Sequence, residues 1–329
     1  MHESSTEKYL GDIFNKSCKS KENIEARVAK GYVRVNTILA MLQEAPLGWT
    51  KIKAGLKLRK AMLINSVMFN SESWHGVTMS QVEDFEQVDQ ALLRGLADGH
   101  AKVSIPAIYL ELGQEPIRYI LAARRIMYLQ TLLKRDNTEM TSKILRAQQA
   151  DPIEGDFCLL VEEDMKMIKL EKSEEEIISM TKGQMKLVVK RKVKEAALKY
   201  LMGENKSKEK TKHIKYHKLE PKQYMIHPRI TNKQASLLFA LRTRTIRGIR
   251  GDFGQMYPNK QCPLDGCKHL DTLPGLLTCP ALRTSVKDHN NSIRYEDVFS
   301  HRLEEQRAAA ELFARLLETR EELLSPPAT

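Results

Sequence analysis

The chain has 329 residues, of which 42% are hydrophobic and 29% are charged, an ordinary balance for a folded, water-soluble protein. Its net charge of +11 favours a polyanionic partner, most simply nucleic acid, because each lysine or arginine set against a phosphate releases a condensed counterion. No apolar run approaches the roughly 20 residues that cross a bilayer, and the N-terminus lacks the apolar core of a signal peptide. We therefore expect an intracellular protein, nuclear or cytoplasmic, that has no membrane partner.

The predicted fold class is mainly α, because apolar residues recur at intervals of three and four through most of the chain. One short strand is predicted, over residues 9–14. Two helix starts have the spacing of a capping box, in which two residues three apart cap each other: Ser80 with Glu83, and Ser173 with Glu176. The longer predicted helices cover residues 22–43, about 50–70, from just after Thr78 to about 93, 106–113, 116–133, 138–150, 184–201, 232–247 and about 298–324.

Residues 203–212 read GENKSKEKTK and include no apolar side chain. A run of this composition cannot bury enough apolar surface to offset the entropy of ordering it. We therefore predict an exposed linker at 203–212, with one helical body on either side. Trp49 and Trp74 fall in helical contexts, and we assign both to the core rather than to a base-stacking surface.

The helix predicted over residues 184–201 is basic along one side. Lys186, Lys190 and Lys194 recur at four-residue intervals with Arg191 beside them, and apolar residues occupy the opposite side. Like charges at this spacing destabilise an isolated helix by roughly 0.2–0.5 kcal/mol per pair, and a phosphate backbone would remove that cost. This ridge is a candidate nucleic-acid surface, and the alternative is a solvated face screened by salt.

A second group of cations lies toward the end of the helix predicted at 232–247. Arginines near a helix end, followed by glycines, suit a close approach to backbone phosphate. They also complement the helix dipole without any ligand. The candidate residues are Arg242, Arg244, Arg247 and Arg250.

Three of the five cysteines are clustered, which argues against a disulfide framework. Cys262, Cys267 and Cys279 are separated by gaps of four and eleven residues within a segment, 250–290, that reads as irregular. A structural zinc site needs four converging ligands, so a fourth must join the three cysteines. His269 is the candidate and His289 is another. The alternative is an irregular loop with free thiols.

Short segments spread over nearly the whole chain share their order and spacing with a known family. They are residues 9–12 (YLGD), 58–62 (LRKAM), 70–74 (NSESW), 82–89 (VEDFEQVD), 92–94 (LLR), 108–113 (IYLELG), 116–118 (PIR), 124–125 (RR), 262–264 (CPL), 271–274 (DTLP) and 279–280 (CP). Together they resemble the C-terminal portion of a non-LTR (LINE-type) retrotransposon reverse transcriptase, which contains the thumb, a helical region and a cysteine knuckle.

The resemblance implies a division of the chain. Residues 1–14 would be the remnant of the palm–thumb junction, 15–100 a thumb-like helical region, 101–202 a helical connector, and 213–329 a C-terminal region beyond the charged linker at 203–212. The catalytic palm would lie upstream of residue 9. The resemblance also implies a histidine four residues before the last cysteine, where this chain has Gly275, and a first cysteine spacing narrower than the one present.

No catalytic residue is predicted. Two-metal nucleotidyl transfer requires clustered carboxylates, and the Asp-Asp pair that the resemblance implies for the palm occurs nowhere in this sequence. We therefore expect a protein that is not an enzyme, takes no small-molecule substrate, and binds RNA or an RNA–DNA hybrid. Two alternatives stay open: a helical protein-interaction module, or a part of an RNA-directed DNA polymerase if an upstream palm exists.

Overall fold

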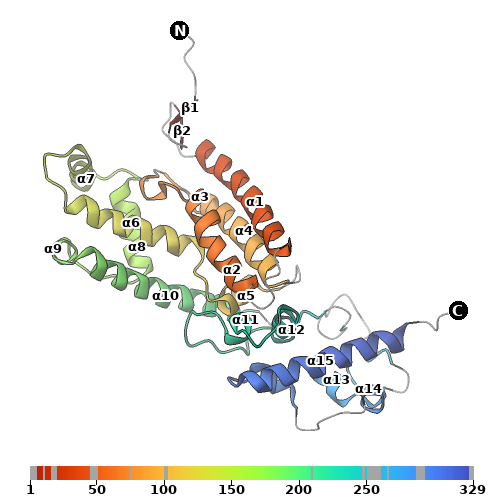
Figure 1. The fold of residues 1–329 in the computed structure, drawn as a ribbon. Coiled ribbons are helices and arrows are strands. Elements are labelled where there is room, and N and C mark those ends of the chain that lie inside the picture. The colour runs from red at the N-terminus through yellow and green to blue at the C-terminus, as the bar shows by residue number, and fades with distance from the viewer. Residues whose placement is uncertain are drawn as a thin grey trace.

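The computed structural model describes residues 6–9, 12–15, 21–44, 51–74, 76–99, 103–208, 210–246, 249, 261–264, 267–286 and 293–325. Within these ranges the fold is mainly α, as the apolar spacing predicted. Figure 1 shows the long helix near the C-terminus at the opposite end of the molecule from the helices of the middle of the chain. None of the described helices is both long enough and apolar enough to cross a membrane.

The N-terminal end forms a small hairpin in place of the single strand predicted at 9–14. Strand β1, Thr6–Tyr9, pairs antiparallel with β2, Asp12–Asn15, in a register that sets Tyr9 against Asp12. Strand pairing of this kind satisfies the backbone groups that a lone strand would leave open.

The first helical layer contains α1, Lys21–Glu44, which packs along α4, Met79–Leu96. Between them in sequence, α2, Lys51–Leu58, continues into a π-helical turn, η2, Arg59–Ile64, and then α3, Asn65–Val67, followed by the short η3, Ser71–Ser73. Trp74 is buried and stacks on Phe85 with 5.5 Å between ring centroids, so the core assignment of Trp74 is confirmed, whereas Trp49 lies outside the described residues.

Helix α4 begins directly after Thr78, as predicted, but its cap is Thr78 and not Ser80. The Thr78 hydroxyl accepts from the Gln81 backbone N–H at 3.4 Å, and the Gln81 side chain accepts from the Thr78 N–H at 3.0 Å. The pairing of Ser80 with Glu83 was therefore wrong, because Thr78 and Gln81 form a capping box two residues ahead of it. The other predicted box is confirmed: Ser173 and Glu176 cap each other at the start of α9.

The second helical layer follows the predicted ranges except at α8, where no helix was predicted, and at the longer end of α10. It contains α5, Ile105–Leu112; α6, Ile117–Leu133; α7, Met140–Ala150; α8, Phe157–Met167; α9, Glu174–Ser179; and α10, Lys182–Lys206. Helix α10 packs against α6 and α5. Gly113 ends α5 at φ +61°, and a Cβ there would stand 2.0 Å from the Glu220 carbonyl carbon, so only glycine fits where these two segments cross.

Most of the described residues of the predicted linker, 203–212, are exposed, but the segment is partly helical and partly buried. Helix α10 continues to Lys206, and Asn205 and Thr211 are almost completely buried. The Asn205 side-chain amide donates to the Thr211 carbonyl at 2.8 Å, and the Thr211 hydroxyl donates to Asn205 Oδ1 at 2.6 Å. Composition did not indicate this partial order, because polar side chains satisfy one another here and helix propagation from Lys182 adds a hydrogen bond for each ordered residue. The division of the chain into two bodies at this segment stays a prediction.

The remaining helices follow this segment. They are α11, Gln223–Ile226; α12, Asn232–Thr243; α13, Leu273–Thr278; α14, Pro280–Ser285; η6, Tyr295–Phe299; and α15, Leu303–Leu324. Helix α12 ends before the predicted position 247 because Arg244 takes the left-handed conformation, with φ 52°. Helix α15 packs against α12 and η6.

Candidate nucleic-acid interface

Helix α10 has the two-sided character that its sequence predicted. Its inner side is a buried apolar stripe with a four-residue repeat. The members of that stripe are Met185, Val189, Val193, Ala197 and Leu201. On its outer side Lys186, Lys190 and Arg191 are exposed and Lys194 is half-buried.

Lysines of α10 line one wall of a groove whose volume is about 920 Å³. The lysines of this wall, called the α10 row, are Lys182, Lys186 and Lys190. The lysines of the other wall, called the α2 row, come from α2 and η2 and are Lys53, Lys57 and Lys60. All six side chains are exposed. Segments more than 100 residues apart in the sequence therefore present two basic rows to one groove.

None of the six lysines has a carboxylate oxygen within 4.0 Å in the described part of the chain. Glu72 and Glu115 also line the groove, so its charge is strongly positive without being uniform. Lysines confined in a cleft focus a positive potential and raise the local concentration of anions. The floor between the two rows is largely apolar and includes Ile120, Met127 and Tyr128.

A buried polar cluster fixes the position of the α2 row. Arg59, in the π-helical turn between Lys57 and Lys60, donates to both carboxylate oxygens of Asp89 at 2.6 and 2.8 Å. It also donates to the Gln114 side chain at 2.9 Å. The Tyr109 hydroxyl donates to Asp89 at 2.9 Å, and burial, followed by the charge of Asp89, raises the pKa of Tyr109 well above its ordinary value. Tyr109 therefore remains a proton donor to Asp89 at physiological pH.

The four predicted ridge residues do not all face the groove. Arg191 and Lys194, together with Lys190, line a smaller hollow of about 320 Å³. His217 and Lys218 contribute to the same hollow. Arg191 also lies 4.0 Å from Glu195, and both side chains are exposed, so this pair contributes little to stability. The predicted ridge thus divides between two adjacent surfaces that share Lys190.

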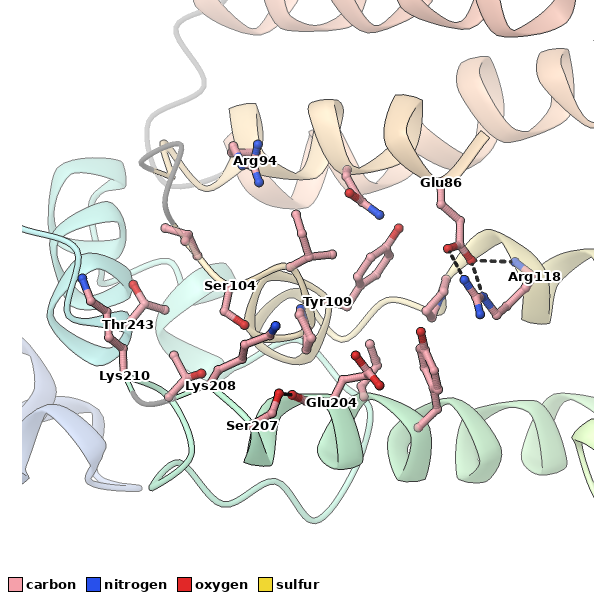
Figure 2. Close-up of a pocket in the computed structure, with 18 residues that line it drawn as sticks. Glu86, Arg94, Ser104, Tyr109, Arg118, Glu204, Ser207, Lys208, Lys210 and Thr243 are labelled. Atoms are coloured by element: carbon pink, nitrogen blue, oxygen red, sulfur yellow. Dashed lines mark hydrogen bonds and ion pairs between the residues drawn. The ribbon is translucent and has the colours of Figure 1, made fainter. Parts of the chain in front are cut away.

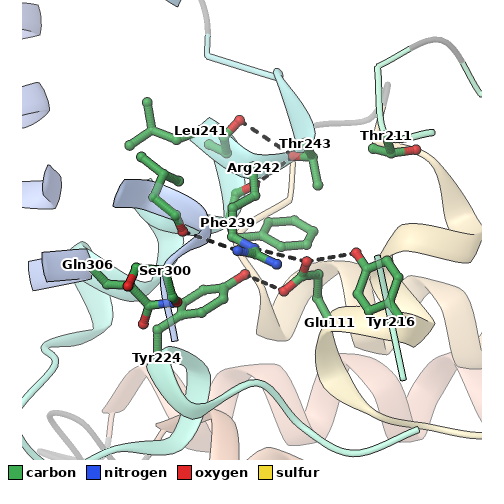
Figure 3. Close-up of polar contacts among 12 residues, drawn as sticks. Glu111, Thr211, Tyr216, Tyr224, Phe239, Leu241, Arg242, Thr243, Ser300 and Gln306 are labelled. Atoms are coloured by element: carbon green, nitrogen blue, oxygen red, sulfur yellow. Dashed lines mark hydrogen bonds and ion pairs between the residues drawn. The ribbon is translucent and has the colours of Figure 1, made fainter. Parts of the chain in front are cut away.

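Arg242 is the clearest departure from the sequence prediction, because its side chain is buried. Its Nε donates to Glu111 at 3.0 Å, and the hydroxyls of Tyr216 and Tyr224 donate to the same carboxylate at 2.7 and 2.8 Å. Figure 3 shows these three donors converging on Glu111. Arg242 also donates to the Val298 carbonyl at 3.1 Å. The prediction of a nucleic-acid contact was wrong for Arg242, because this end of α12 faces α5 and η6 rather than solvent.

Of the other three arginines of that group, the structure describes only Arg244. Arg244 is half-buried, and its carbonyl accepts a hydrogen bond from Lys210 Nζ at 3.2 Å. Arg247 and Arg250 lie outside the described residues, so their predicted role stays a prediction. Of the predicted cations, Lys186 and Lys190 therefore line the groove, together with the α2 row.

Sequence reasoning missed the α2 row. Lys53, Lys57 and Lys60 repeat at intervals of four and three, the same helical signal that identified the α10 ridge. That spacing was available as evidence of a second basic face. Nothing in the sequence indicated that α2 and α10 line the same groove.

The chain has no match among protein-family models, curated proteins or solved structures. The likeness to non-LTR reverse transcriptases therefore stays a prediction from the sequence motifs.

A separate cluster joins the three cysteines. The Sγ atoms of Cys262, Cys267 and Cys279 all lie within 4.8 Å of one another, so these three residues could bind a metal ion. His269, the predicted fourth ligand, points its side chain to solvent and contributes its carbonyl, which accepts from the Cys262 N–H at 2.9 Å. The imidazole of His269 is therefore not part of the cluster, and His289 lies outside the described residues.

The three thiols affect one another's ionisation. Burial, followed by hydrogen bonding to Cys267 and by the neighbouring thiols, raises the pKa of Cys262 to about 12. Three thiolates at this separation repel one another unless a metal ion stands between them. Three soft sulfur donors are typical of zinc and other thiophilic metals.

Gly275 stands where the family resemblance implied a histidine, and the local backbone explains the difference. Thr272 caps α13 by accepting from the Gly275 N–H at 3.1 Å. A Cβ at Gly275 would stand 2.3 Å from the Leu270 carbonyl oxygen. A histidine therefore cannot occupy this position without a shift of the chain. Asp271, just before the cap, is buried and paired with Arg320 of α15 at 2.9 and 3.0 Å, which holds the cluster against that helix.

Proposed function

We propose that this protein binds RNA or an RNA–DNA hybrid through the lysine groove, and that it does so without catalysing a reaction. One observation carries the proposal: two rows of exposed lysines, with no carboxylate partner among the described residues, line the same groove. The net charge of +11 agrees with this choice of partner. The family resemblance of the sequence points to the same class of ligand.

The physical argument rests on the cost of unneutralised charge. Lysines spaced four residues apart on a helix repel one another, and a second row on the opposite wall adds to that repulsion. A nucleic-acid backbone supplies phosphates along a line, so it can neutralise both rows at once and release its own condensed counterions. Contacts of this kind position a nucleic acid without reading its sequence, so we propose affinity with little base preference.

A second candidate function is the docking of an acidic amphipathic helix from another protein. The apolar floor of the groove favours it, because such a helix could bury apolar side chains between the rows while its carboxylates face the lysines. Nucleic acid is the preferred candidate because six exposed lysines line the groove, against two carboxylates, those of Glu72 and Glu115. A docked helix would need the apolar floor of the groove, whereas a nucleic-acid backbone would need only the two lysine rows.

The deciding experiment measures binding to three probes over a salt series: a single-stranded RNA, an RNA–DNA hybrid, and an acidic amphipathic peptide. Nucleic-acid binding predicts a linear fall of log affinity against log salt, by roughly 0.7 to 0.9 per phosphate contact. Replacing Met127 by Gln, a polar change in the floor, should weaken the peptide far more than the RNA. Absence of nucleic-acid binding at low salt would overturn the preferred function.

We propose in addition that Cys262, Cys267 and Cys279 hold a zinc ion with a structural role. The ion would tie the segment that carries Cys262 to the cap of α14 at Cys279, beside the Asp271–Arg320 pair. A partner inside the cell, in the nucleus or cytoplasm, follows from the proposed nucleic-acid ligand. If a palm precedes this chain in a longer product, the same groove would serve an RNA-directed DNA polymerase.

A further inference from the structure

A second cavity, of about 740 Å³, lies between α4, α5 and the C-terminal end of α10. It shares no lining residue with the lysine groove, although α10 contributes to both. Figure 2 shows the cavity with Arg94 projecting from α4, Ser104 at the start of α5, and Lys208 just beyond the end of α10. A cavity of this size is in the range that accommodates small organic ligands.

The charges of the cavity are predominantly positive once paired groups are set aside. Glu86 and Arg118 neutralise each other through two short contacts, 2.8 and 2.7 Å. Arg94 and Lys208 make no ion pair with any described residue, and one further carboxylate, that of Glu204, lines the cavity. An anionic ligand would meet two uncompensated cations here.

Two polar atoms at the cavity make no hydrogen bond within the described ranges. They are Nε of Arg94 and Oγ of Ser104, and both are shielded from solvent. Ser104 directly precedes α5, where a serine ordinarily caps the helix, yet its hydroxyl makes no cap. A shielded polar atom without a partner is uncommon, so both atoms are candidates for a hydrogen bond to a ligand.

We propose that this cavity binds a phosphate monoester, with Arg94 and Lys208 as its charge partners and Ser104 as a hydrogen-bond donor. A phosphate has several acceptor oxygens and so can serve a guanidinium, an ammonium and a hydroxyl at the same time. Glu204 and the ring of Tyr200, which also line the cavity, suit the hydroxyls and base of an attached nucleoside. The site is independent of the lysine groove and of the function proposed for it.

Two kinds of molecule carry such a phosphate monoester: a free nucleotide, and a nucleic acid at its 5′-phosphate end. The experiment uses the full chain and measures, by isothermal titration calorimetry, its binding of inorganic phosphate, a nucleoside 5′-monophosphate, and one oligonucleotide with either a 5′-phosphate or a 5′-hydroxyl. A preference for the phosphorylated oligonucleotide identifies the end as the source. Binding of the monophosphate without that preference identifies the free nucleotide.

Three single variants locate the site. Lys208→Gln and Arg94→Gln should each weaken phosphate or monophosphate binding by about tenfold, the effect of losing one charge-assisted hydrogen bond. Lys206→Gln, which removes an exposed lysine two residues away that does not line the cavity, should leave binding unchanged. Lys208 is exposed, so its variant keeps the test valid even if Arg94→Gln folds poorly. Equal binding by the parent and Lys208→Gln, or no binding of any phosphate probe by the parent, overturns the proposal.

Discussion

Arg59 and Asp89 form a two-point ion pair, Nε to Oδ1 at 2.6 Å and Nη2 to Oδ2 at 2.8 Å, and both side chains are almost completely buried. The pair joins the π-helical turn of η2 to α4. Because Lys57 and Lys60 stand on either side of Arg59 in sequence, the pair also sets where the α2 row enters the groove. A buried contact therefore controls the position of an exposed basic surface.

Removing one partner of this pair should be costly. Asp89→Ala leaves the Arg59 guanidinium buried without a counter-charge, and we expect a loss of about 3–5 kcal/mol in the free energy of unfolding. Urea unfolding followed by circular dichroism gives the value. Glu25→Ala is the control, because Glu25 pairs with Lys21 at 3.9 Å on an exposed surface and should change stability by less than about 1 kcal/mol. A loss at Asp89 no larger than that of the control would show that the pair is not structural.

Both lysine rows should contribute to nucleic-acid affinity. Replacing the three lysines of the α10 row by Gln should reduce the slope of log affinity against log salt by about 2 for single-stranded RNA, and replacing the α2 row should do the same. Glutamine preserves the length and helix propensity of the side chain, so circular dichroism should be unchanged.

The matched control removes the same number of charges from elsewhere. Its positions, all exposed and outside the groove, are Lys143, Lys166 and Lys199. The control variant should keep a slope close to that of the parent. If the α2 row proved as silent as the control, the binding surface would be the α10 ridge alone, and the paired-row interpretation would fail.

The thiol cluster should retain about one equivalent of zinc through purification. Cys279→Ser removes the most buried ligand and should release the metal, as should Cys267→Ser. His269→Ala should retain it, because the His269 imidazole is exposed and only its carbonyl contacts the cluster. Elemental analysis and thiol titration measure both outcomes. Loss of metal in His269→Ala would restore the ligand assignment that the sequence suggested.

Stability should depend on pH through Asp164. Burial raises its pKa to about 6, against the opposing effect of Arg125 at 3.4 Å. The folded state therefore holds a proton that the unfolded state releases near pH 4, so the stability contributed by this group is greatest at low pH and is lost as pH rises toward 6.

The measurement compares the parent with Asp164→Asn by urea unfolding at several values between pH 4 and 7. The advantage of the parent over the variant should shrink by at most about 1.4 kcal/mol per pH unit and level off above pH 6. Parallel stability curves for the two proteins would show that Asp164 ionises normally.

Two glycine substitutions should act in opposite directions. Gly203→Ala lies inside α10, where an added Cβ meets no atom within 4 Å, so we expect stabilisation by roughly 0.5–1 kcal/mol. Gly113→Ala introduces a Cβ at positive φ beside the Glu220 backbone and should destabilise strongly. Thermal unfolding distinguishes them. An unstable Gly203→Ala protein would argue against the continuation of α10 through this position.

Local signals in the sequence were sufficient for much of the fold. The Ser173–Glu176 box depends on two residues three apart, and the α10 ridge on a four-residue repeat, so both are readable without knowledge of packing. The extent of α5 followed in the same way from Pro106 and Gly113. These features are fixed by chain-local geometry.

Contacts between distant segments could not be read in this way. The burial of Arg242 depends on Glu111, which is 131 residues away, and nothing near Arg242 distinguishes it from a surface arginine. The partial order of the predicted linker has a related cause, since the composition of residues 203–212 does not show that Asn205 and Thr211 satisfy each other. The candidate groove was half predicted, because one row was recognised and its partner on α2 was not.

The Glu111 carboxylate has a practical consequence for dividing this chain. It is completely buried, and its three side-chain donors all come from positions at least 105 residues later in the sequence. An N-terminal fragment that ends at residue 208 would contain this carboxylate without any of those donors. Such a fragment should aggregate when expressed alone. Co-expression with a second fragment that begins at residue 210 should restore a soluble complex, because that fragment supplies the three side-chain donors to the Glu111 carboxylate.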